Sequence, residues 1–203
     1  MLSSIIHNTD SFIASVPKLK RKKYGQFFTN MATANFMASL FCFDLTKPEL
    51  HLLDAGAGTG ILSAAVIDKL IQSGYTGRIY LTCYETDELV LPLLKSNLEL
   101  AKEECGINYE IIQDNYLTSQ LFEDNTKLYD YIIGNPPYLK IPKEAKEAKA
   151  MPSVCYGTPN LYFLFWAMGI HNLKQDSELV YIVPRSWTSG AYFKRFRQYL
   201  FKH

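Results

Sequence analysis

Apolar residues along the chain form either short continuous runs or longer stretches in which they recur every three or four positions. The short runs are rich in β-branched and aromatic residues, and they predict buried strands at 51–54, 78–84, 108–113, 129–133 and 179–183. The helical spacing predicts helices up to about residue 16 and at 30–43, 59–72, 88–104, 160–172 and 189–201. Strands that alternate with helices form parallel sheets. The expected fold class is therefore α/β, with a doubly wound, mostly parallel sheet that has helices on both faces.

The composition indicates one folded domain. The chain has 203 residues, 48% of them hydrophobic and 14% aromatic, which suffices for one sizeable core and excludes a mainly disordered chain. Lys and Arg outnumber Asp and Glu by only 21 to 20, so any contact with DNA must be local. The chain shows no signal-peptide pattern and no apolar stretch of about 18 residues, so we expect a cytoplasmic protein without membrane spans. The cysteines form no C-x-x-C pair, which indicates reduced thiols and no metal site; they are Cys42, Cys83, Cys105 and Cys155.

A glycine-rich loop follows the predicted strand at 51–54. Asp54 ends that strand, and Gly56, Gly58 and Gly60 follow in a G-x-G-x-G spacing. Glycine lets the backbone turn tightly and lets a ligand approach closely, and open α/β sheets bind ligands at such strand ends. The spacing differs from the G-x-G-x-x-G of dinucleotide folds and from phosphate-binding loops. A carboxylate beside the loop would repel a pyrophosphate but would suit the ammonium and sulfonium groups of S-adenosylmethionine (AdoMet).

Two more acidic residues stand at the ends of the next predicted strands. Glu85 follows the strand at 78–84, where its carboxylate can accept hydrogen bonds from both ribose hydroxyls of a nucleoside. Asp114 follows the strand at 108–113, where it could accept the amino hydrogen of adenine. Each acid alone could be a solvated residue, but three acids at the ends of three successive strands predict one cofactor site.

The sequence Asn135-Pro136-Pro137-Tyr138 directly follows the fourth predicted strand and opens an irregular segment that extends to 158. The two prolines fix the backbone and remove two donors, so the loop presents carbonyl oxygens together with the Asn135 amide oxygen. Such rigid acceptors fit an NH2 group that is conjugated to a ring or a carbonyl, and they would favour a pyramidal nitrogen whose lone pair points at a methyl group. Tyr138 can stack on the face of a planar substrate.

The expected strand order, 3-2-1-4-5, makes the strands at 51–54 and 129–133 neighbours at the topological switch point of the sheet. The glycine loop and the Asn-Pro-Pro-Tyr loop would then face the same crevice. The sequence therefore predicts that a methyl donor and its amine acceptor meet there.

Together these motifs resemble the AdoMet-dependent DNA adenine-N6 methyltransferases, in the gamma-class motif order of restriction–modification systems. The resemblance runs from about Lys22 to the C-terminus and includes the segment 24–29, in which Phe27 and Thr29 stand where the family holds the methionine end of the cofactor. It implies a Rossmann-like class I AdoMet methyltransferase fold. The implied catalytic residues are Asn135, Pro136, Pro137 and Tyr138, and the implied cofactor-binding residues are Phe27, Thr29, Asp54, Gly56, Gly58, Gly60, Glu85 and Asp114.

The resemblance also implies that the chain consists of two parts. Residues 1–23 are expected to form an N-terminal helix and a basic linker, and residues 24–203 the catalytic domain. Domains of this family carry two further strands and a target-recognition domain, so we expect a truncated catalytic domain whose last strand has an open edge. Four lysines near the catalytic loop could contact DNA phosphates or belong to a solvated loop: Lys140, Lys143, Lys146 and Lys149.

The activity that the resemblance implies is methyl transfer to N6 of an adenine flipped out of double-stranded DNA. Release-factor glutamine methyltransferases share the Asn-Pro-Pro-Tyr loop because their acceptor is also a conjugated NH2 group, so a glutamine amide stays open as acceptor, as does a structured RNA. The segment 25–29 and the long insert between Tyr138 and Asn160 favour DNA. A non-catalytic AdoMet-binding fragment, or a subunit that needs a partner to recognise DNA, is the alternative from another class.

Overall fold

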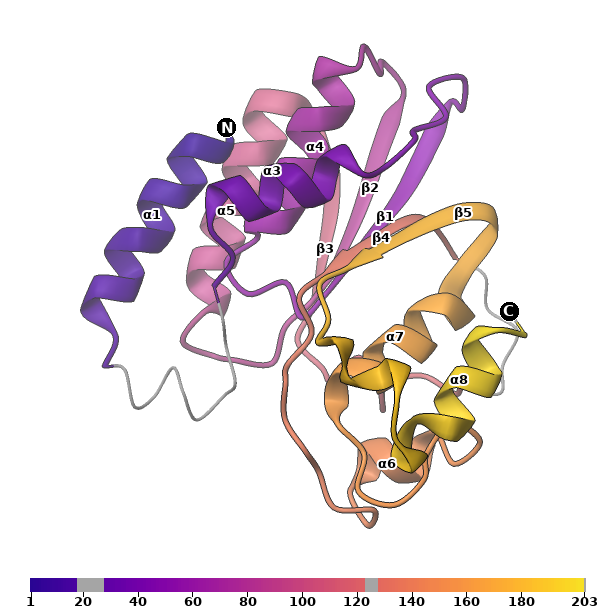
Figure 1. Cartoon of the computed structure of the whole chain (residues 1–203). Coiled ribbons are helices and arrows are strands. Elements are labelled where there is room, and N and C mark those ends of the chain that lie inside the picture. Colours follow the sequence, from indigo (N-terminus) through magenta and orange to yellow (C-terminus); the bar gives the residue numbers. More distant parts are fainter. Residues whose placement is uncertain (18–27, 123–127, 203) are drawn as a thin grey trace.

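The computed structural model describes residues 1–17, 28–122 and 128–202 and contains a five-stranded sheet at its centre (Figure 1). The strands lie in the order β3-β2-β1-β4-β5, and every neighbouring pair is parallel. Their bounds are Glu49–Ala55 for β1, Arg78–Tyr84 for β2, Asn108–Ile112 for β3, Tyr129–Gly134 for β4 and Leu173–Tyr181 for β5. The predicted fold class and strand order are confirmed. Because the order reverses between β1 and β4, the carboxyl ends of these two strands flank the switch point.

Helices cover both faces of the sheet (Figure 1). One face carries α1 (Leu2–Ser15), α3 (Met31–Ser39), α4 (Ile61–Gln72) and α5 (Leu91–Cys105); the other carries α6 (Lys146–Ala150), α7 (Leu161–Asn172) and α8 (Lys194–Leu200). Side chains alternate along β1, so that Leu50 and Leu52 pack under the first group of helices while Leu53 and Ala55 pack under the second. Two apolar clusters therefore enclose the sheet and hold its strand ends in place.

The C-terminal part differs most from the sequence pattern. β5 begins at Leu173 and ends at Tyr181, whereas the apolar run predicted 179–183. The first half of β5 is polar, because this strand is the edge of the described sheet and an edge strand can pair through its backbone without burying its side chains. The helix expected at 189–201 starts only at Lys194, after two short 3-10 helices, because Gly190 between them has a φ of 85°.

The helix expected at 30–43 ends at Ser39. Asn30 caps it, since its side chain accepts a hydrogen bond from the Thr33 N–H at 2.9 Å. The apolar residues beyond the helix, Phe41 and Phe43, instead pack on the ring of Tyr131. Their apolar character therefore serves the core of the sheet rather than a helical face.

No helix in the described ranges is both long and apolar enough to cross a membrane. The four cysteines are all free. Among the residues with described positions, no three His, Cys, Asp or Glu side chains come together as metal ligands.

Candidate active site

A cavity of about 220 Å³ lies where the glycine loop, the ends of β2 and β3 and the Asn-Pro-Pro-Tyr loop meet. Eight of the residues that the sequence singled out line it: Thr29, Gly56, Gly58, Glu85, Asp114, Asn135, Pro136 and Pro137. Asp54, Gly60 and Tyr138 are not part of this wall. Phe27 lies outside the described residues. The expected crevice between β1 and β4 is thus present, and it holds both loops.

The glycine loop is anchored to the end of β2. The N–H groups of Gly56 and Ala57 both donate to the carbonyl of Tyr84, each at 2.9 Å. Gly58 has a φ of 57°, which L side chains rarely adopt. In the part of the chain that the structure describes, no atom outside Gly58 and its two neighbours lies within 4 Å of the position that a Cβ on Gly58 would take. The backbone at Gly58 therefore leaves room for a ligand to approach it closely.

Glu85 links the glycine loop to the turn after β2. Its Oε2 accepts the Gly58 N–H at 2.8 Å, and its Oε1 accepts the N–H groups of Thr86 and Asp87 at 2.7 and 2.8 Å. Burial raises the pKa of this carboxyl, and the three backbone N–H groups oppose that effect only in part. A carboxylate offers about four acceptor positions. Glu85 can therefore hold the loop and still accept a hydroxyl from a ligand in the cavity.

Asp54 takes a different position from the one its sequence context suggests. Its side chain is fully buried, and its Oδ2 accepts both the N–H and the hydroxyl of Ser63 in the first turn of α4, at 3.2 and 2.7 Å. Its Oδ1 has no hydrogen-bond partner among the described residues. Burial raises the pKa of Asp54 to about 7, against the lowering effect of the Ser63 hydrogen bonds. The structure thus gives Asp54 a role at the start of α4, and a direct role toward a cofactor stays a prediction.

This buried carboxyl predicts an unusual pH dependence of stability. Between pH 3.8 and about 7 the folded protein keeps a proton on Asp54 that the unfolded chain has released. The free energy of unfolding should therefore fall as the pH rises through this window, with a contribution of up to about 1.4 kcal/mol per pH unit. The variant Asp54→Asn cannot ionise and should lose this contribution, which urea unfolding at a series of pH values would measure. The exposed Asp114→Asn variant serves as control, and an unchanged slope in Asp54→Asn would contradict the assignment.

Asp114 lies at the exposed edge of the cavity, as its predicted contact with adenine requires. Its neighbour Asn115, which the sequence interpretation missed, also lines the cavity. Asn115 donates from Nδ2 to Glu147 of α6 at 2.8 Å and accepts the Leu117 N–H at 3.0 Å. This contact connects α6, in the segment expected to be irregular, to the wall of the site.

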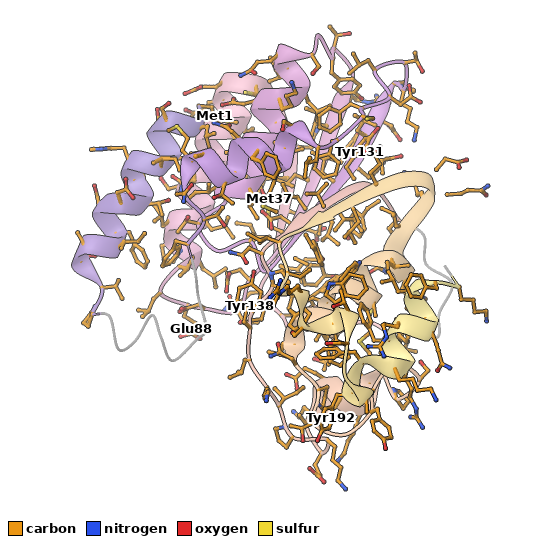
Figure 2. The ribbon with its side chains drawn as sticks, viewed as in Figure 1. Met1, Met37, Glu88, Tyr131, Tyr138 and Tyr192 are labelled. Atoms are coloured by element: carbon orange, nitrogen blue, oxygen red, sulfur yellow. The ribbon has the colours of Figure 1, made fainter. Side chains whose placement is uncertain are left out.

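The side chain of Asn135 is oriented at both ends. Its Nδ2 donates to Thr29 Oγ1 at 3.3 Å, and its Oδ1 accepts the Tyr138 hydroxyl at 2.6 Å. The Tyr138 hydroxyl also lies 2.9 Å from the carbonyl oxygen of Ile182, and a single hydroxyl hydrogen serves one acceptor at a time. Figure 2 shows Tyr138 at the end of the sheet, between the two groups of helices. Thr29, the last residue of the motif at 24–29, is therefore in direct contact with the catalytic motif.

The apolar part of the cavity wall was missed by the sequence interpretation. It includes Phe28, Ile61, Leu62, Leu139, Leu161 and Phe165. Phe165, from α7, lies 3.7 Å from the position that a Cβ on Gly56 would take. Helix α7 is apolar on nearly all sides, so its sequence gave no sign of which residue faces the site. Asp87, also missed, could have been suspected from its place two residues after Glu85.

The chemistry of the cavity fits AdoMet. The acids Glu85, Asp87 and Asp114 suit ribose hydroxyls and positive charge, the apolar wall suits an adenine ring, and the open backbone at Gly58 suits close approach. A parallel sheet in this order, with a glycine loop after β1 and acids after β2 and β3, defines a class I AdoMet-dependent methyltransferase.

Within this class, the chain belongs to the Eco57I restriction-modification methylase family, which it matches over residues 22–203. It is 35% identical to the type II methyltransferase M.BsuBI of Bacillus subtilis over 98% of this chain, and 37% identical to M.PstI of Providencia stuartii over 88%. These alignments cover 42% and 36% of the two relatives, so the chain spans less than half of their length. A release factor glutamine methyltransferase of Fusobacterium nucleatum is 32% identical over 68% of this chain and 35% of that protein.

Solved structures agree on the fold. The methyltransferase subunit of a type I restriction-modification system from Streptococcus thermophilus superposes with a TM-score of 0.69 at 20% identity, over 91% of this chain and 41% of that chain. A putative class I AdoMet-dependent methyltransferase from Listeria monocytogenes gives a TM-score of 0.65 at 19% identity, over 90% and 56%. The resemblance to restriction–modification methyltransferases that the motifs indicated is confirmed.

Proposed function

We propose that this chain carries the catalytic domain of a restriction–modification enzyme that methylates the exocyclic N6 of adenine in double-stranded DNA. The observation that carries the proposal is the shared cavity: Asn135 and Pro136 line the same wall as Gly58 and Glu85. A methyl donor held by the glycine loop and an amine held by the Asn-Pro-Pro-Tyr loop would therefore be neighbours. The same proposal divides the chain into an N-terminal segment, 1–23, and a catalytic domain, 24–203. It also includes a cytoplasmic location, where the DNA substrate is found.

The chain's own groups account for the chemistry. AdoMet, when bound, supplies a methyl group on a positively charged sulfur. The amide oxygen of Asn135 and the carbonyl of Pro136 would accept the two N–H bonds of the adenine amine, which localises the nitrogen lone pair for attack on the methyl carbon. Because these acceptors are fixed before the substrate arrives, they stabilise the positive charge that develops on the nitrogen. The amine loses one of its protons after it gains the methyl group, so no separate strong base is needed.

In the structure, the Tyr138 hydroxyl already donates a hydrogen bond to the Asn135 amide oxygen, which the proposed mechanism uses as acceptor. It donates to Asn135 Oδ1 at 2.6 Å, so an incoming amine must compete with it for the acceptor positions of that oxygen. We propose that the hydroxyl then turns to the Ile182 carbonyl, 2.9 Å away, while the ring stacks on the adenine. The hydroxyl therefore keeps the Asn135 amide in its orientation while the acceptor site is empty.

Two variants separate the ring of Tyr138 from its hydroxyl. Tyr138→Phe keeps the stacking surface and should keep the transfer rate to within about threefold, while Tyr138→Ala should lower it by a factor of about 10 to 100, as the loss of one stacking contact implies. Initial rates of tritium transfer from labelled AdoMet to DNA measure both. If Tyr138→Phe were as slow as Tyr138→Ala, the hydroxyl rather than the ring would be essential.

Local positive charge supports DNA as the substrate. The four lysines near the catalytic loop, Lys140, Lys143, Lys146 and Lys149, are all exposed and outnumber the two glutamates among them, of which Glu144 pairs with Lys143 at 3.8 Å. Residues 182–203 add five basic side chains and no acidic one: Arg185, Lys194, Arg195, Arg197 and Lys202. Both groups lie in the part of the chain that carries α6 and α8, on one face of the sheet (Figure 1). Contacts of this kind bind phosphates without reading sequence.

The similarity to a release factor glutamine methyltransferase makes a protein amide the second candidate acceptor. The two are separated by incubating the purified chain with tritiated AdoMet and either unmethylated plasmid DNA or a release factor. Label recovered in N6-methyladenine after DNA digestion would support the proposal. Label in the release factor with none in DNA would refute it. An AdoMet-binding fragment that needs a partner for DNA recognition would transfer to neither.

A further inference from the structure

One face of α1 contacts the back of the glycine loop. Thr9 donates from its hydroxyl to the hydroxyl of Thr59 at 2.9 Å, and both side chains are almost completely buried, with 1% and 2% exposed. Thr59 stands between Gly58 and Gly60 and lines the cavity. The N-terminal helix, which lies before the part of the chain that matches the family, thus contacts the loop on which the cofactor site depends.

Asn97 of α5 extends this contact into a network. Its Nδ2 donates to the Thr59 carbonyl at 2.9 Å, and its Oδ1 accepts Nδ2 of Asn8 in α1 at 3.0 Å. The Asn97 side chain is fully buried. Two polar groups of Thr59, its hydroxyl and its carbonyl, are therefore hydrogen-bonded to α1 and α5. A buried network of this kind is costly to break, because each group left without its partner loses a hydrogen bond that water cannot replace.

A second contact joins α1 to the cavity. Phe12 packs edge-to-face against Phe28 with the ring centroids 6.3 Å apart, and Phe28 lines the cavity. Phe12 lies three positions after Thr9 and four positions after Asn8, so its side chain is on the same side of the helix as each of them. Figure 1 shows α1 lying along α5, outside the sheet. One helical face thus supports the cavity at two separate points.

We infer that α1 is a positioning element of the cofactor site, and that Thr9 and Asn97 are positioning residues that select the binding conformation of the glycine loop. Gly58 and Gly60 have φ angles of 57° and 84°. Glycine adopts positive φ about as readily as negative φ, so the loop has little intrinsic preference for this conformation. Glu85 fixes it on the cavity side through the Gly58 N–H, and the α1 network fixes it on the opposite side. Without the network, AdoMet would bind only the fraction of molecules whose loop is in place, which lowers the apparent affinity.

The test compares three substitutions on the same helix by calorimetric titration with AdoMet. Thr9→Val keeps the shape but removes the hydroxyl, and it should raise the Kd by a factor of about 5 to 10, as the loss of one buried hydrogen bond implies. Thr9→Ser restores the hydroxyl and should return the Kd to within about twofold of the wild type. Ile5→Val removes one buried methyl group from the same helix, at a residue that does not line the cavity. It should lower the urea midpoint but leave the Kd unchanged.

Hydrogen exchange of the ligand-free protein gives a second readout, independent of binding. Peptides that contain residues 56–63 should exchange faster in Thr9→Val than in the wild type, and should be unchanged in Ile5→Val. The inference fails if Thr9→Val binds AdoMet like the wild type with unaltered exchange. It also fails if Ile5→Val weakens binding as much as Thr9→Val, since the effect would then follow helix stability. These outcomes concern the cofactor alone, so they do not depend on which acceptor receives the methyl group.

Discussion

Replacement of Asn135 by alanine is expected to lower methyl transfer to DNA by a factor of at least about 100 to 1,000, the usual cost of removing one preorganised polar group that acts on the transition state. AdoMet affinity should stay within about twofold of the wild type, because the amide acts on the acceptor amine rather than on the cofactor. Tritium transfer measured at saturating AdoMet gives the rate, and calorimetry gives the cofactor Kd. The structure supports this distinction between acceptor and cofactor roles. The described hydrogen bonds of Asn135 go to Thr29 and Tyr138, and none of them goes to a residue of the glycine loop.

Asn30→Ala is the matched control for this variant. It also removes an asparagine amide, but one that caps α3 through the Thr33 N–H and does not line the cavity. It should cost about 1 kcal/mol of stability and leave transfer unchanged. If Asn135→Ala lost cofactor binding and transfer in equal measure, Asn135 would belong to the cofactor site and the proposed acceptor role would be wrong.

The sheet could be predicted from the sequence because its central strands are buried on both faces. β4 is buried at every position, so it appears in the sequence as a mainly apolar run, interrupted by Asp130. The first half of β5 gave no such signal. It is polar, and its place is set by pairing with β4, where Leu173 lies opposite Tyr129 before a shift in register. Backbone pairing at an edge leaves little trace in the side chains.

The candidate site was predictable where its residues form short motifs, and not where they meet across the fold. The spacing of Gly56 and Gly58, or of Asn135 and Pro136, is local and could be recognised directly. The contacts of Thr59 with Thr9 and of Asn135 with Thr29 join residues 50 and 106 positions apart, which only the packing of helices on the sheet brings together.

The direction in which the Asp54 side chain points could not be predicted from the motif. A carboxylate at the end of a strand has the same sequence context whether it faces the cavity or the first turn of the next helix. Here Oδ2 bonds Ser63 of α4, and the side chain is not part of the cavity wall. The side to which it turns depends on the pleat of β1, which the motif does not specify.

Glu85→Ala is expected to raise the Kd for AdoMet by a factor of about 30 to 150, equivalent to about 2–3 kcal/mol for hydrogen bonds to a charged group. The effect is large because one carboxylate has two functions. It holds Gly58 and the Thr86–Asp87 turn through three N–H groups, and it lines the cavity where ribose hydroxyls are proposed to bind. Alanine leaves all three backbone donors without this acceptor and removes the ligand contact as well.

The neighbouring Glu88 provides a matched control, since it is an exposed glutamate in the same turn (Figure 2) and does not line the cavity. Glu88→Ala should bind AdoMet with the wild-type Kd. Because burial raises the pKa of Glu85, protonation should weaken wild-type binding on acidification at a higher pH than an ordinary glutamate would cause. Glu85→Ala should show no such acid limb. An acid limb that persisted in Glu85→Ala would assign it to another group, and an unchanged Kd in that variant would exclude Glu85 from the cofactor site.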